Sequence, residues 1–152
     1  MHKHRCHRFV SRHTAWHGTV ALALALAFLS PGISVAGQGA DMPLYTCLAD
    51  SEAASGIVGV QLCTAEHTET LVNRSEPDNL QVRRGALISS VDATGIGATG
   101  GLTEGDVIYR IGGNDVADAG AAAQQLDRIG TSADTVVNFL RKGRPYRIKL
   151  RQ

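Results

Sequence analysis

Two short apolar runs joined by a glycine-rich turn constrain the fold of this chain more than any other feature. Ala86–Val91 is a strand-like run, and Val107–Ile111 is a second one. Between them lies Gly101–Asp106 (GLTEGD), in which a Gly-Asp pair leads directly into the second run. Gly112–Asp115 (GGND) then has the composition of a further turn. This order of elements predicts a small β domain.

Two further segments extend the β pattern. Ile57–Cys63 has apolar residues at positions 58, 60 and 62, an alternation typical of a strand with one buried face. Near the carboxyl end, Thr135–Arg141 and Arg144–Leu150 flank Lys142-Gly143. Two strand-like runs around a two-residue turn of this type predict a β-hairpin.

Helical signals are few. Ala119–Ile129 is rich in Ala and Gln, with Asp118 as a candidate N-cap and Gly130 at the stop. A shorter helix is possible around Glu66–Val72, and we expect Gly37–Ser55 to be irregular except where Cys47 holds it. Five to six short strands and one main helix do not build a parallel α/β sheet. The expected class is α+β, mainly β: a partly open antiparallel β-barrel or sandwich with a helix across its mouth.

The first 36 residues have the three parts of a secretory signal peptide. Met1–Thr19 carries basic residues and no acid, Val20–Leu29 is an unbroken apolar core, and Ser34–Ala36 supplies the small residues of a cleavage site. The apolar core is shorter than the about 20 residues of a membrane span. We expect cleavage after Ala36 and a periplasmic or secreted protein without a stable membrane span. An uncleaved N-terminal anchor is the alternative.

Charge and histidine placement exclude two classes of function. Removal of the leader takes away Lys3, Arg5, Arg8 and Arg12 but none of the 14 acidic residues, which leaves a weakly acidic chain. Nucleic-acid binding depends on neutralising phosphates, so we expect no nucleic-acid partner. The group formed by His2, His4, Cys6, His7, His13 and His17 lies entirely in the leader. Its spacing matches no structural metal site, and we expect no metal and no cofactor.

Cysteine usage agrees with export. Cys47 and Cys63 are the two cysteines that follow the leader, and an even count in an oxidising compartment indicates one disulfide. Closing a loop of about 17 residues would stabilise the fold by roughly 3 kcal/mol in the chain-entropy model. Two buried free thiols or a redox pair are the alternatives. The sequence contains no Cys-x-x-Cys, which argues against the redox pair.

Five pieces in this order resemble a PDZ domain, specifically that of bacterial HtrA-type periplasmic serine proteases, with the protease domain absent. The resemblance covers Ser55 to Arg151. The pieces that carry it are Gly85–Ile88, Gly101–Ile108, Ile111–Gly113, Val116 and Leu140–Arg144. One segment departs from the family, because Gly95–Gly101 (GIGATGG) stands where an alanine-rich helical turn is usual. The first short helix of the family is therefore doubtful here. Together with the leader and the cysteine pair, the resemblance divides the chain into a signal peptide (1–36), an N-terminal segment that we expect the disulfide to hold (37–54) and a PDZ-like domain (55–151).

The resemblance also implies a peptide-binding site. Val58-Gly59-Val60 occupies the place of the carboxylate-binding loop, where glycine lets successive backbone N–H groups converge on an anion. A bound peptide would then extend the sheet along an open edge from Val60 to Thr64, with Val60 and Leu62 facing the groove. Helical spacing places three residues on the opposite wall: Ala119, Ala123 and Leu126. The small Ala119 predicts a groove that prefers apolar ligands. The alternative is that Ala119 and Ala123 only pack the helix closely and no groove is open.

The motifs that suggest catalysis are weak. Gly95-x-Gly97-x-x-Gly100 matches a dinucleotide fingerprint, but the next strand follows too soon for the required helix. His67 is the one histidine after the leader, and no nucleophile loop is present to pair with it. We therefore expect a non-catalytic, exported adaptor that recognises C-terminal or extended peptides of envelope proteins. The alternative function is an envelope-assembly or secretion-system component that uses the domain for protein docking.

Overall fold

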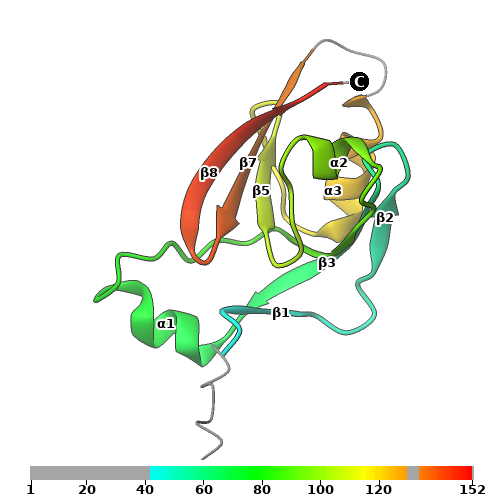
Figure 1. Cartoon of the computed structure of the whole chain (residues 1–152). Coiled ribbons are helices and arrows are strands. Elements are labelled where there is room, and N and C mark those ends of the chain that lie inside the picture. Colours follow the sequence, from blue (N-terminus) through cyan, green and yellow to red (C-terminus); the bar gives the residue numbers. More distant parts are fainter. Residues whose placement is uncertain (1–41, 130–133, 152) are drawn as a thin grey trace, which may run out of the picture. The chain divides into compact units, whose positions relative to one another are not determined.

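The computed structural model describes residues 42–129 and 134–151. The predicted signal peptide and its histidine-rich start lie outside these ranges. Residues 37–152 form one compact unit, to which all the following observations belong. Its strands in the described ranges are β1 (Tyr45–Cys47), β2 (Ala53–Ser55), β3 (Val60–His67), β4 (Ala86–Val91), β5 (Val107–Ile111), β6 (Asn114–Asp115), β7 (Thr135–Arg141) and β8 (Arg144–Leu150). The helices there are α1 (Glu69–Ser75), α2 (Ile96–Thr99) and α3 (Ala119–Leu126) (Figure 1).

The strands form one antiparallel sheet in the order β1-β3-β4-β5-β7-β8. Strand β2 also pairs with β3, and β6 pairs with β5. The mainly β, antiparallel class predicted from the sequence is confirmed. The described residues contain eight strands rather than five or six, because β1, β2 and β6 have only two or three residues each. Runs this short carry no readable alternation.

Local signals placed several elements correctly. The hairpin β7–β8 turns at Lys142 and Gly143, both with positive φ (50° and 74°), as a tight two-residue turn requires. Strands β4 and β5 have the predicted bounds. Asp118 caps α3, because its Oδ1 accepts a hydrogen bond from the backbone N–H of Ala121 at 2.8 Å. The helix ends at Leu126, earlier than the predicted Ile129.

Two boundaries around β3 differ from the prediction. The strand begins at Val60 instead of Ile57 and continues to the exposed His67, because its far end pairs with β1. Helix α1 consequently starts at Glu69. Thr68 is its N-cap, and the Thr68 hydroxyl accepts a hydrogen bond from the N–H of Leu71 at 3.3 Å.

The doubtful short helix is present as α2, and its glycines have a packing role. A Cβ at Gly95 would lie 2.8 Å from the carbonyl oxygen of Val58, and one at Gly97 would lie 3.0 Å from the same atom. The N–H of Gly97 donates to that oxygen at 2.9 Å. The segment that departs from the family therefore packs directly against the turn that precedes β3.

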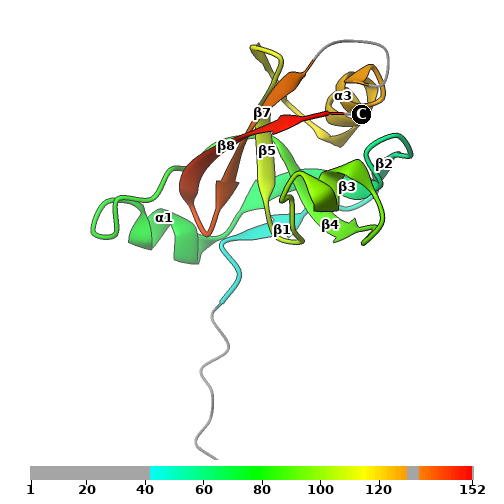
Figure 2. The same ribbon diagram turned by 45° about the horizontal axis from the view of Figure 1, so that its top comes forward.

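The apolar interior has two parts. The larger cluster lies between the sheet and α3 and includes Leu62, Ile88, Leu126 and Phe139, each at most 1% exposed. A smaller cluster around Leu71 includes Tyr45 of β1. Helix α1 lies at the opposite end of the sheet from α2 and α3 (Figure 1 and Figure 2). The larger cluster thus supports the candidate site, whereas the smaller one anchors β1.

Candidate functional site

The structure brings six of the seven predicted peptide-site residues together, all except Gly59, and these six are buried. Val58, Val60 and Leu62 are 0–2% exposed on the strand side. On the helix side, Ala119 and Leu126 are fully buried and Ala123 is 8% exposed. All six belong to one apolar cluster that joins the strand to the helix. In this conformation α3 packs closely, as in the alternative interpretation of its alanines.

The expected open edge of β3 is occupied, so that part of the prediction is wrong. Strand β2 pairs antiparallel with the start of β3, in the register Ser55↔Val60, Ala54↔Gln61 and Ala53↔Leu62. Strand β2 also packs against α3. The region predicted to be irregular therefore forms a strand between β3 and α3. This pairing depends on contacts that no local pattern reveals.

The backbone amides of the glycine turn are also occupied. Gly59 has φ of +74°, and its N–H donates to the carbonyl oxygen of Ser55 at 2.9 Å. The N–H of Val58 donates to Ser55 Oγ at 3.2 Å. Ser55 Oγ in turn donates to Asp127 Oδ1 at 2.7 Å, just beyond the end of α3. Ser55, which is 1% exposed, thus connects the turn to the helix.

The rest of the β3 edge is covered by residues 45–52. Cys47 and Cys63 form the predicted disulfide, with their Cα atoms 5.4 Å apart. In the segment between β1 and β2, the N–H of Leu48 donates to the carbonyl oxygen of Thr64 at 2.9 Å. The N–H of Thr64 donates to Ser51 Oγ at 3.0 Å. The side chain of Thr64 contacts α3 instead. Thr64 Oγ1 accepts a hydrogen bond from the N–H of Ala119 at 3.2 Å, which holds the start of α3.

Two groups beside this region have shifted pKa values. Burial raises the pKa of Tyr45 above 10.0, although the nearby backbone N–H of Arg83 acts in the opposite direction. Tyr45 Oη accepts from that N–H at 3.0 Å. At the glycine turn, the backbone N–H of Thr94 donates to the Asp92 carboxylate at 2.8 Å and lowers the pKa of Asp92. Asp92 is exposed, so its charge is a surface feature of the turn.

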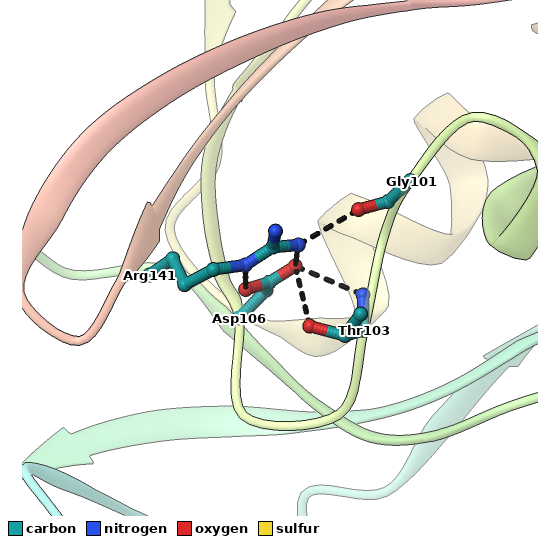
Figure 3. Close-up of polar contacts among 4 residues, drawn as sticks. All are labelled: Gly101, Thr103, Asp106 and Arg141. Carbon is teal, nitrogen blue, oxygen red and sulfur yellow. Dashed lines mark hydrogen bonds and ion pairs between the residues drawn. The ribbon is translucent and has the colours of Figure 1, made fainter.

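The Gly-Asp signature has a structural role that the sequence did not reveal. Asp106 is 1% exposed and forms a two-point ion pair with Arg141 of β7, at 2.8 Å to Nε and 2.7 Å to Nη2 (Figure 3). Asp106 also accepts from the N–H of Thr103 at 2.9 Å, and Arg141 Nη2 donates to the carbonyl oxygen of Gly101 at 2.7 Å. The hydrogen bond to Asp106 raises the pKa of Arg141. The pair closes the loop between α2 and β5 onto β7.

A separate hollow of about 970 Å³ lies away from β2 and α3, neither of which contributes to its lining. Tyr45, Leu80, Leu140 and Lys142 are among the residues around it.

In the part of the chain that the structure describes, no group of three or more His, Cys, Asp or Glu side chains could hold a metal ion. None of the helices in the described ranges combines the length and apolar character that a membrane crossing needs.

The fold and the site define a class of protein: a small antiparallel β domain whose helix lies along one strand, beside a glycine turn with inward-facing amides. The chain belongs to the PDZ domain family, because the family model matches residues 65–140, half of the chain. The match begins inside β3, after the glycine turn. PDZ domains are non-catalytic modules that bind peptides, which agrees with the non-enzymatic expectation for this domain.

Two similar solved structures carry PDZ domains of HtrA proteins. One is the HtrA-type protease AlgW with a decapeptide, at 26% identity and a TM-score of 0.47, covering 62% of this chain and 27% of that chain. The other is the HtrA3 PDZ domain bound to a phage-derived ligand (FGRWV), at 18% identity and a TM-score of 0.46, covering 62% of this chain and 81% of that one. The present chain thus spans little more than a quarter of the AlgW chain. No curated protein matches the sequence.

Proposed function

We propose that this chain is an exported PDZ module that binds C-terminal or extended peptide segments of envelope proteins by adding them as a strand along β3. One observation carries the proposal. The position between β3 and α3 holds an extended segment in antiparallel register, and the last residue of that segment lies on the amides of the glycine turn. The segment is β2 of the same chain. Its contacts are those of strand addition.

The chemistry of the turn suits a peptide terminus. The N–H groups of Val58 and Gly59 converge on Ser55, and a terminal carboxylate supplies two acceptor oxygens for the same donors. Val60 and Leu62 form the strand wall, and Ala119, Ala123 and Leu126 form the helix wall. A short peptide offers few buried anchors, so we expect micromolar affinity, about −8 kcal/mol, for the site once β2 has been displaced from it.

Export is the second part of the proposal. It is supported by the leader-like composition of residues 1–36 and by the disulfide between Cys47 and Cys63, which suits an oxidising compartment. Sequencing the amino terminus of the protein from an envelope fraction tests it. A chain that begins at Gly37 is expected. A chain that begins at Met1 would instead favour the anchored alternative.

Peptide titration followed by NMR tests the binding site. Residues 37–152 would be titrated with a pentapeptide that has a free carboxylate and with the same peptide amidated. We expect shifts of the amides from Val58 to Leu62 and along α3, at least tenfold weaker for the amidated peptide because the charge-assisted hydrogen bonds are lost. Equal binding of both peptides, or shifts confined to the hollow around Leu80, would reject the site.

A further inference from the structure

Strand β2 has the features of a bound ligand within its own domain. It pairs with β3 through only three residue pairs and packs against α3, at the place where the proposed function requires a peptide. The hydrogen bonds of its last residue, Ser55, end on Val58, Gly59 and Asp127. A strand of three residues is marginal without such end contacts.

The surroundings of each β2 residue indicate what the site accepts. Ser55 is buried, with its hydroxyl between a turn amide and the Asp127 carboxylate. Ala54 is exposed, so its position tolerates any side chain. Ala53 is partly buried against the apolar cluster that contains Ala119 and Ala123, so a small side chain suits this position. The pattern is small–any–Ser.

We infer that Ala53–Ser55 is an internal ligand that keeps the peptide site shut until a segment ending in small–any–Ser displaces it. This inference rests on the proposed function and names its ligand class. It differs from the apolar preference expected from Ala119, because the carboxylate of Asp127, itself an exposed residue, accepts a hydrogen bond from the buried hydroxyl at the position of the last ligand residue. A hydroxyl donates to Asp127, whereas an apolar terminal side chain leaves that carboxylate without this hydrogen bond.

The disulfide explains why β2 stays in place. The loop closed by Cys47 and Cys63 contains both β2 and the glycine turn. Within this loop, the segment Leu48–Ser51 is hydrogen-bonded to Thr64. A tethered segment competes with a free peptide at an effective concentration in the millimolar range. The native protein should therefore bind a micromolar ligand only weakly.

A disulfide staple tests whether β2 must leave. Ala54 and Gln61 are directly opposite each other and both exposed, so A54C/Q61C fixes β2 to β3 without touching the buried face. The matched control is N138C/R147C, which joins an opposite pair in the β7–β8 hairpin. Mass mapping verifies the new bond and the native Cys47–Cys63 bond in both proteins.

A variant with a weakened attachment of β2 tests the opposite case, in which β2 leaves the site more easily. Ser55→Ala removes the hydroxyl contacts to Val58 and Asp127 but leaves the β2 backbone intact. Gln124→Ala, at an exposed position of α3, is its control. The probes are three fluorescent hexapeptides: Asp-Ser-Glu-Ala-Ala-Ser, which copies residues 50–55, the same peptide ending in Val, and the Ser peptide amidated.

For the Ser peptide, we expect no binding by the stapled protein and weak binding by the native protein and the two control variants. Ser55→Ala should bind this peptide about tenfold more tightly than the native protein does. The Val peptide should bind Ser55→Ala about tenfold more weakly than the Ser peptide. Asp127→Ala, added to Ser55→Ala, should remove this preference.

Two results would overturn the inference and leave the proposed function intact: equal peptide binding by the stapled and native proteins, or tighter binding of the Val peptide. Failure of every form to bind any of the three peptides would overturn both proposals. Hydrogen exchange at Gly59, whose N–H donates to the backbone carbonyl oxygen of residue 55, then tells whether β2 had left. Faster exchange in Ser55→Ala than in the native protein would assign the failure to the peptide-binding function.

Discussion

Two glycine turns in this domain are closed by a polar side chain in different ways. At Gly56–Gly59, the neutral Ser55 accepts from the Val58 amide and reaches the exposed Asp127. At Gly101–Asp106, the buried carboxylate of Asp106 accepts from the Thr103 amide and pairs with Arg141 through two hydrogen bonds. Both arrangements satisfy a turn amide. Only the second one buries a charge.

The difference in charge separates a turn that stays closed from a turn whose bound segment can be exchanged. A buried carboxylate that loses its guanidinium partner is costly, so the loop before β5 has no favourable open state. A neutral hydroxyl contributes little net free energy, and any peptide with an equivalent acceptor can replace it. The ion pair therefore maintains the fold, whereas the serine contact suits a site whose occupant changes. Four changes test this comparison, in order of decreasing effect.

Asp106→Ala should have the largest effect. It leaves the Arg141 guanidinium and the Thr103 N–H without their shared acceptor, and we expect a loss of about 3 kcal/mol in the free energy of unfolding. Denaturant unfolding measures it. Asp115→Ala is the control, because Asp115 pairs with Arg110 at the surface and its loss should leave the midpoint unchanged. Similar losses in both variants would contradict the role of burial.

Removal of the disulfide should act next. Replacing Cys47 and Cys63 by Ala releases a loop of about 17 residues, and the chain-entropy model predicts a loss of roughly 3 kcal/mol, reduced by any residual structure in the unfolded chain. Unfolding curves with and without dithiothreitol measure it. The native protein should respond to the reductant and the double variant should not. If the stability of the native protein does not change with the reductant, the disulfide is not what holds β2 in place.

Ser55→Ala should cost less, about 1 kcal/mol, because its hydrogen bonds are neutral on one side and partly solvated on the other. A double-mutant cycle with Asp127→Ala measures the coupling between the two side chains. Additive effects would show that the 2.7 Å contact contributes nothing to holding β2. A loss as large as that of Asp106→Ala would remove the distinction between the two turns.

The smallest effect concerns pH. The pKa of Tyr45 is raised in the fold, so the stabilisation from the neutral phenol is fully present below pH 10 and is lost as the pH rises through the folded value. The difference in absorbance at 295 nm between the native protein and Tyr45→Phe should titrate above 10.0. Titration of Tyr45 at or below that value would show that β1 is not packed as described.

Local sequence signals predicted the elements whose contacts lie close together along the chain. Lys142-Gly143 specified a hairpin because both positions take positive φ, and Asp118 specified the start of α3 through an N–H three residues away. The disulfide was predicted from the cysteine count and from the expectation of an oxidising compartment. Val60, Leu62 and Ala123 of the candidate site share one buried cluster, and their role in peptide binding stays a prediction.

Long-range contacts decided the remainder. Ser55 and Asp127 are 72 positions apart, and Asp106 and Arg141 are 35 apart, so no periodicity or cap pattern joins them. Strand β2 forms only because β3 and α3 offer it a partner on each side, and three small residues carry no strand signal alone. Patterns of apolar residues and turns specified which segments become strands or helices. Whether the edge of β3 is open or filled depends on the folded chain as a whole, because it is a competition between segments that meet only there.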